Sequence, residues 1–392
     1  MLYFQSIIVY TLLALLMCYG AYRSQGTTKQ ARYWGWVPIV LFTLIFGLRY
    51  GVGVDYDNYL RMYDNSSGYN SFALFLENER FEFSFSLLIY CCHFLNMPVY
   101  VFFSLIAFIQ IFLLYKTFKD ENNILIYIYA TLIFTGICMY SFMNILRHEI
   151  AFCIFLYSLQ FIRDNKLIKY WICCLLAFSF HHSAILLFPL YFIWIHRKGV
   201  LNRPIIELTA VLICFALSFV TAWQDMLHFF DNIITLMGYE KYIDIADNMT
   251  INSKIGITRI LNLIINMLII INSKRIKEYF KSDLFNILYD LYVIGISLGY
   301  IFLGSMMFQR IIVYFNHTQF IVLAYALCYL YETRKQKTSQ LIRYYLIIFF
   351  IFVSYGSFLY NCYNNTGAYV FYFQDELWGI KDDLRSQMLN NL

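Results

Sequence analysis

Polar and ionisable side chains gather at four points along an otherwise apolar chain. They are residues 49–59 (RYGVGVDYDNY), Arg147 with His148, His181 with His182, and Arg310. An arginine guanidinium offers a planar set of donors that matches the oxygens of a phosphate. If the four points face one side of a membrane, they predict a cationic site for a dianionic or trianionic group, and pyrophosphate fits best. If they are scattered, they are ordinary helix flanks.

The first of these segments combines a cation, a carboxylate and a row of tyrosines. Arg49 alone would be an interfacial anchor, since its side chain can extend to the membrane surface. Two glycines then allow a tight turn, after which Asp55 presents a carboxylate that is a candidate general base. If the following residues are helical, their tyrosines form one stripe, which suits either sugar rings or the interfacial aromatic belt. These tyrosines are Tyr56, Tyr59 and Tyr63.

Arg147 and the paired histidines interrupt two later apolar passages. Arg147 suits a phosphate, although Glu149 is close enough in sequence to neutralise it. His181 and His182 are adjacent, so on a helix they point roughly 100° apart and do not chelate one metal comfortably. With no further ligand one turn away, a metal site is not favoured. One histidine can donate to a phosphate or move a proton, and the other is expected to be structural. Glu82 is a second candidate base.

The composition excludes an ordinary water-soluble globule. Of the 392 residues, 61% are hydrophobic and only 14% are charged, whereas a soluble domain has about 25% charged residues. Apolar runs approaching the ~20 residues of a membrane span recur along the whole length. The sequence therefore predicts an all-α polytopic membrane protein with a single domain over residues 1–392, of which residues 1–6 resemble the remnant of a protease-cleavable tag. The net charge of +5 is too modest to indicate nucleic-acid binding.

Charged connections predict the orientation of these spans. Lys- and Arg-rich connections alternate with neutral or acidic ones, and the cationic ones mark the cytoplasmic side. The alternation holds only if residues 83–95 do not cross the membrane, so we expect a re-entrant or surface-lying helix there. The count is then about twelve spans with both termini outside. Residues 49–97 and 222–256 form long outer loops, and all four polar points fall on the outer face.

The polar segments, in their order along the chain, resemble the EpsG-like family of exopolysaccharide proteins, which belongs with the Wzy-type O-antigen and capsule polymerases. The matching pieces are residues 49–59, 144–151 (NILRHEIA), 181–184 (HHSA) and 310–315 (RIIVYF). One departure is His148, where the family usually carries glutamine. The resemblance implies a multi-pass GT-C-type glycosyltransferase in the bacterial cytoplasmic (inner) membrane, with its active site facing outward. Such an enzyme joins oligosaccharide repeat units carried on undecaprenyl pyrophosphate.

The resemblance also implies roles for individual residues. Arg49, Arg147 and Arg310 would clamp the pyrophosphate, Asp55 would accept the proton of the acceptor hydroxyl, and His182 or His181 would hydrogen-bond the pyrophosphate. The catalytic set would be Asp55, Arg147 and His182, and the substrate-binding set would be Arg49, Tyr56, Tyr59, Glu82, His148, His181 and Arg310. We expect no metal and no other cofactor, because the arginines neutralise the charge. Expected partners are the lipid-linked oligosaccharides, membrane lipids, a flippase and a chain-length co-polymerase, and no nucleic acid.

Three other functions fit some of the same residues. An O-antigen ligase would use the same chemistry on a different acceptor. A lipid-linked glycan flippase or a small-solute transporter would place ionisable groups near the membrane midplane, often between inverted repeats, and no such repeat is visible. An acyltransferase could use His181 or His182. The gathering of polar groups at span ends favours the polymerase over transport.

Overall fold

The computed structural model describes most of the chain and divides it into two compact units. The described residues are 2–24, 26, 28–79, 81–118, 124–195, 199–219, 257–302, 306–364 and 367–389. The first unit is Met1–Phe161, Lys166–Phe188 and Ile351–Leu392, and the second is Ile162–Asn165 and Pro189–Phe350. The predicted outer loop 222–256 lies outside the described residues. Each unit is described below by itself.

The described part of the chain is an all-α membrane protein. Apart from the two-residue strands β1 (Arg49–Tyr50) and β2 (Val370–Phe371), its regular elements are helices. Six helical segments are long and apolar enough to cross a membrane: Leu2–Arg23, Val99–Phe118, Ile257–Phe280, Asp283–Ile301, Arg310–Thr333 and Thr338–Tyr360. Helix α5 (Phe83–Phe94) has 12 residues, short of the ~20 that a span requires. The count of about twelve spans stays a prediction.

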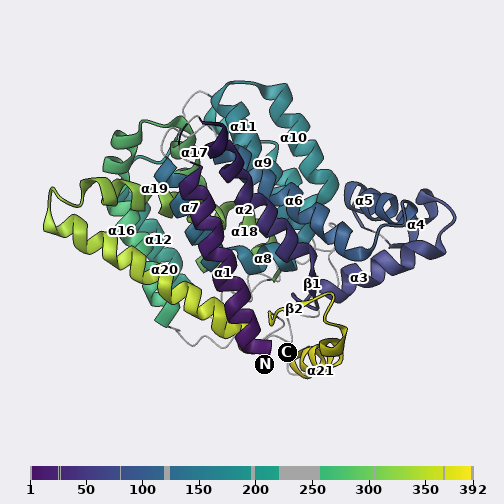
Figure 1. The fold of residues 1–392 in the computed structure, drawn as a ribbon. Helices are drawn as coiled ribbons and strands as arrows, with labels where there is room; N and C mark the ends of the chain where they lie inside the picture. The colour runs from purple at the N-terminus through teal and green to yellow at the C-terminus, as the bar shows by residue number, and fades with distance from the viewer. Residues whose placement is uncertain are drawn as a thin grey trace. The chain divides into compact units, whose positions relative to one another are not determined.

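The first unit is built around the N-terminal helices. Its helices are α1 (Leu2–Arg23), α2 (Lys29–Gly47), α3 (Tyr56–Asn65), α4 (Phe72–Glu79), α5, α6 (Val99–Phe118), α7 (Ile124–Ile137), α8 (Met139–Asn144), α9 (Leu146–Arg163), α10 (Leu167–Phe180) and α21 (Trp378–Leu389). Figure 1 shows α1 running beside α2 and α7, and α2 also packs on α6. The first residues of the chain, expected to be a tag remnant, begin α1 itself.

The C-terminal end of α2 lies unusually close to α6. Gly47, the last residue of α2, faces Ser104. A Cβ atom added at Gly47 would lie 1.7 Å from the Ser104 Oγ atom and 2.9 Å from its Cα atom. Only glycine therefore fits here, and this close contact fixes where β1 begins.

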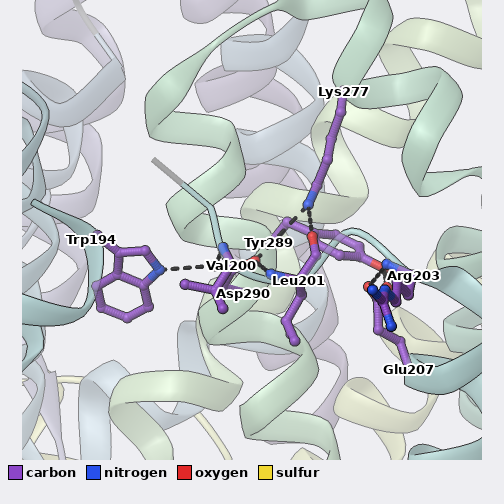
Figure 2. Close-up of polar contacts among 8 residues, drawn as sticks. All are labelled: Trp194, Val200, Leu201, Arg203, Glu207, Lys277, Tyr289 and Asp290. Atoms are coloured by element: carbon purple, nitrogen blue, oxygen red, sulfur yellow. Dashed lines mark hydrogen bonds and ion pairs between the residues drawn. The ribbon is translucent and has the colours of Figure 1, made fainter. Parts of the chain in front are cut away.

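The second unit surrounds α17 (Asp283–Ile301), which packs on α12 (Pro204–Leu217), α18 (Met306–Asn316) and α19 (Thr318–Thr333). Its other helices are α11 (Leu190–Trp194), α16 (Ile257–Phe280) and the part of α20 (Thr338–Asn364) up to Phe350; the rest of α20 belongs to the first unit. The buried carboxylate of Asp290, on α17, accepts hydrogen bonds from the Trp194 indole at 2.8 Å and from the backbone N–H of Leu201 at 3.1 Å (Figure 2). The Lys277 ammonium lies 3.9 Å away.

A second carboxylate completes this cluster, which the sequence pattern did not reveal. Glu207, buried in the first turn of α12, accepts from the Tyr289 hydroxyl at 2.6 Å and from the Arg203 backbone N–H at 2.7 Å (Figure 2). Ionisable groups within a membrane span often mark a functional site. Here each carboxylate accepts a backbone hydrogen bond from the connection between α11 and α12, Asp290 from Leu201 and Glu207 from Arg203. The cluster therefore fastens that connection to the helices of the second unit.

The contact at Gly47 yields a prediction about stability. We expect Gly47→Ala to lower the free energy of unfolding by about 2 kcal/mol, because α2 and α6 must separate to admit a methyl group. The measurement is thermal unfolding of the detergent-purified protein. Gly356→Ala in α20 is the matched control, since a Cβ there meets no atom within 4 Å. Equal behaviour of the two variants would contradict the close packing of α2 and α6.

Candidate functional site

A tight turn follows β1 and places Asp55 next to the end of α8. Gly51 and Gly53 have positive φ angles of 63° and 100°, which glycine adopts without strain. A Cβ atom at Gly53 would lie 3.1 Å from the Met143 carbonyl oxygen. The backbone N–H of Asp55 donates to the Asn144 side-chain oxygen at 3.0 Å. The turn is therefore fastened to the residues that precede the second polar segment.

A break between two helices presents that second segment. Helix α8 ends at Asn144, Ile145 departs from helical geometry, and α9 begins at Leu146. Arg147 and His148 consequently lie in the first turn of α9. Backbone N–H groups in a first turn lack intrahelical partners and carry partial positive charge, so this end of α9 favours an anion.

Arg147 is paired with a carboxylate from a distant part of the sequence. Its guanidinium donates to Glu82, the residue that precedes α5. The Arg147 side chain is 20% exposed, whereas that of Glu82 is 6% exposed. The guanidinium carbon lies 4.4 Å from the centre of the Phe81 ring, and the Tyr59 side chain hydrogen-bonds the same guanidinium.

Glu149, the alternative local partner of Arg147, contacts α8. It is completely buried, and the hydroxyl of Ser141 donates to its carboxylate. Ser141 lies on α8, so this hydrogen bond joins the first turn of α9 to α8. Local neutralisation by Glu149 is therefore not what the structure shows, and Glu82 supplies the negative charge instead.

Arg49 is completely buried and bonded to backbone carbonyls. Its guanidinium donates to the carbonyls of Phe46 and, at 3.2 Å, Met143, and it lies 4.6 Å from the centre of the Phe103 ring. Burial lowers the pKa of Arg49 to about 10, with tyrosines such as Tyr56 acting in the opposite direction, so the side chain stays protonated at pH 7. Among the described residues no carboxylate pairs with it. The carbonyl ends of α2 and α8 supply the compensating negative charge.

The predicted tyrosine stripe exists, but it faces the protein interior. Tyr56, Tyr59 and Tyr63 are 1%, 3% and 5% exposed. Their rings contact phenylalanines of α5 and α6, namely Phe103, Phe85 and Phe102. These tyrosines therefore anchor α3 against α5 and α6, and a role for Tyr56 and Tyr59 in binding sugar rings stays a prediction.

The histidines divide into a buried pair and an exposed single residue. His181 is buried, its Nδ1 atom lies 2.6 Å from the Ser183 hydroxyl, and its ring is 4.8 Å from that of His148. This pair joins the end of α10 to the first turn of α9. His182 is exposed, with its ring 5.1 Å from that of Phe178. Of the two adjacent histidines, His182 is the one that a ligand can reach.

The structure thus brings three of the four polar segments together within the first unit, around the first turn of α9. Arg310 lies on α18 in the second unit, at the first residue of a candidate span. Two contributors were not singled out from the sequence: Asn144, which opens the segment 144–151, and Phe81. Across the part of the chain that the structure describes, no three His, Cys, Asp or Glu side chains come close enough to hold a metal ion.

The C-terminal segment supports the same site from its other side. Strand β2 pairs antiparallel with β1, placing Arg49 opposite Phe371. The ring of Tyr50 stacks on Trp378 with a centroid separation of 4.3 Å, and its hydroxyl donates to Asp382 at 3.0 Å. Residues from both ends of the sequence therefore determine the position of the turn that carries Asp55.

Of the comparisons with known proteins, the one with family models finds a match. No curated protein and no solved structure matches the chain. The family model for the EpsG family matches residues 32–373, a range that contains all four polar segments. Because this match covers most of the chain, the protein belongs to the EpsG family.

Proposed function

We propose that this protein is a polysaccharide polymerase that joins undecaprenyl-pyrophosphate-linked repeat units on the outer face of the cytoplasmic membrane. Family membership and the apolar helices support an exopolysaccharide-related role for a multi-pass membrane protein. The observation that carries the reaction is Arg147, a partly exposed guanidinium at the start of α9 that already holds a carboxylate. A group that binds one anion in this position can bind another.

The reaction requires three events, and the chain has a residue for each. The acceptor hydroxyl oxygen attacks the anomeric carbon of the donor sugar, and the bond from that carbon to the diphosphate oxygen breaks. The electron pair of that bond stays with the diphosphate, whose growing charge Arg147 and the first turn of α9 stabilise. Asp55 accepts the proton of the acceptor hydroxyl. His182, exposed beside this region, donates a hydrogen bond to the diphosphate.

Arg49 has a positioning role in this proposal. Its guanidinium is buried and committed to two carbonyls, so it sets the Asp55 turn and does not contact the diphosphate. Arg310 lies in the second unit, and its part in binding the substrate stays a prediction. The proposal needs no metal ion, because arginine donors supply the charge.

Arg147→Ala and Arg49→Ala are expected to fail in different ways. Arg147→Ala should lower the rate of polymer formation per folded molecule roughly 100-fold or more, as expected for loss of a group that stabilises developing charge. Arg49→Ala should reduce the amount of folded protein, because two buried carbonyls lose their donor. Folded yield by size-exclusion chromatography and product ladders from purified protein with its lipid-linked repeat unit measure the two effects.

Arg61→Ala is the matched control for both arginine variants, because Arg61 is exposed on α3 and its hydrogen bonds among the described residues go to its own helix. We expect it to fold and to polymerise normally. Full activity of Arg147→Ala would contradict the proposed role in diphosphate binding. Single-unit transfer without a ladder in the wild type would indicate a ligase.

Asp55→Asn tests the proposed base. The bond from Asp55 to Asn144 uses the backbone N–H, so the substitution leaves the turn fastened. We expect donor binding to persist and turnover to fall by about 10²–10⁴-fold, while Asp57→Asn, two residues later, stays active. Polymers of normal length from Asp55→Asn would exclude Asp55 as the base and leave Glu82 or His182 as the next candidates.

A further inference from the structure

The Glu82 carboxylate is bound to the Arg147 guanidinium, the group that binds the donor diphosphate in the proposed function. The ion pair joins the residue before α5 to the first turn of α9. Glu82 is the more deeply buried partner, with 6% of its side chain exposed against 20% for Arg147. The exposed fraction of Arg147 leaves a direction from which a second anion can approach.

Two anions cannot share this guanidinium without a large electrostatic cost. The pair lies against the rings of Phe81 and Phe85, where water is scarce and charges interact strongly. A diphosphate brought to Arg147 therefore repels the Glu82 carboxylate, whereas an empty site attracts it. The affinity of Arg147 for the diphosphate therefore depends on how readily the Glu82 carboxylate moves away from the guanidinium.

The surroundings of Glu82 allow its side chain to leave while α5 stays in place. Glu82 makes no side-chain hydrogen bond to the start of α5, and the hydrogen bond to Arg147 is the one that its carboxylate makes among the described residues. Helix α5 is held separately, because the hydroxyls of Ser84 and Ser179 lie 2.7 Å apart and connect α5 to α10. Rotation of one side chain is sufficient to open the anion site.

We propose that Glu82 is a built-in competitor for the diphosphate site. The Glu82 carboxylate moves away from Arg147 when the diphosphate of the incoming donor binds. After sugar transfer, the carboxylate binds Arg147 again and displaces the lipid diphosphate that was the leaving group. Glu82 thus limits inhibition by product and speeds turnover. This inference rests on the proposed function, because it assumes that Arg147 binds a diphosphate.

The substitution Glu82→Gln separates charge from shape. Glutamine keeps the size and one hydrogen-bond acceptor but no longer competes as an anion. We expect binding of inorganic pyrophosphate to tighten about tenfold, which corresponds to about 1.4 kcal/mol. In the polymerisation assay KM for the donor and kcat should both fall, because the product diphosphate now leaves slowly. A side chain with a structural role alone would not lower KM.

The experiment is titration calorimetry of the full-length, detergent-purified protein with inorganic pyrophosphate. Glu79→Gln is the matched control: it removes the same charge three residues earlier, where the carboxylate accepts hydrogen bonds from Asn65 and Tyr69. Glu82→Ala removes the competing charge by a second route and should also tighten binding. Glu82→Asp, which retains the charge, should bind pyrophosphate as the wild type does.

The outcomes distinguish this inference from the proposed function. If pyrophosphate binds through Arg147, so that Arg147→Ala abolishes binding, but neither Glu82→Gln nor Glu82→Ala binds it more tightly, then Glu82 is not a competitor and the proposed function stands. If Arg147→Ala binds pyrophosphate as well as the wild type does, the proposed function itself fails. Tighter binding in both uncharged variants and not in Glu79→Gln supports the inference.

Discussion

The burial of one guanidinium is the constraint on which the arrangement of the site depends. The buried Arg49 guanidinium makes hydrogen bonds to the carbonyl groups of Phe46 and Met143, at the ends of two helices, in place of hydrogen bonds to water. The chain next to Met143 continues into Asn144, which holds the backbone of Asp55. The cation therefore sets the distance between the ends of α2 and α8, and the proposed base takes its position from that distance.

Arg49 and Arg147 show how one residue type takes different roles in one site. Arg49 follows the end of a helix, where carbonyl groups surround a cation, and it is completely enclosed. Arg147 lies near the start of a helix, where backbone N–H groups repel a cation and attract an anion. Its positive charge is stable there because Glu82 supplies a negative charge. The start of α9 is consequently the place where the proposed exchange of anions would occur, whereas the end of α2 encloses its cation.

The sequence predicted the class of fold and the segments that meet, but not their contacts. Composition and hydropathy were sufficient for an all-α membrane protein, since span length follows from bilayer thickness. Periodicity placed Tyr56 and Tyr59 on one face but could not say that this face is buried. Glu149 was the carboxylate near Arg147 that the sequence pointed to as an alternative partner, whereas the approach of Glu82 is set by tertiary packing. The division into two units and the buried cluster around Asp290 depend on long-range contacts, which hydropathy does not encode.

The pairing of β1 with β2 has a consequence for biosynthesis. The ribosome completes Arg49 and Tyr50 long before it reaches Val370 and Phe371, which complete the two-stranded sheet. Until that late segment is translated, the turn carrying Asp55 lacks its strand partner. The pairing at the proposed site therefore forms only after the last apolar helix has been made, and a chain that ends before Val370 lacks it.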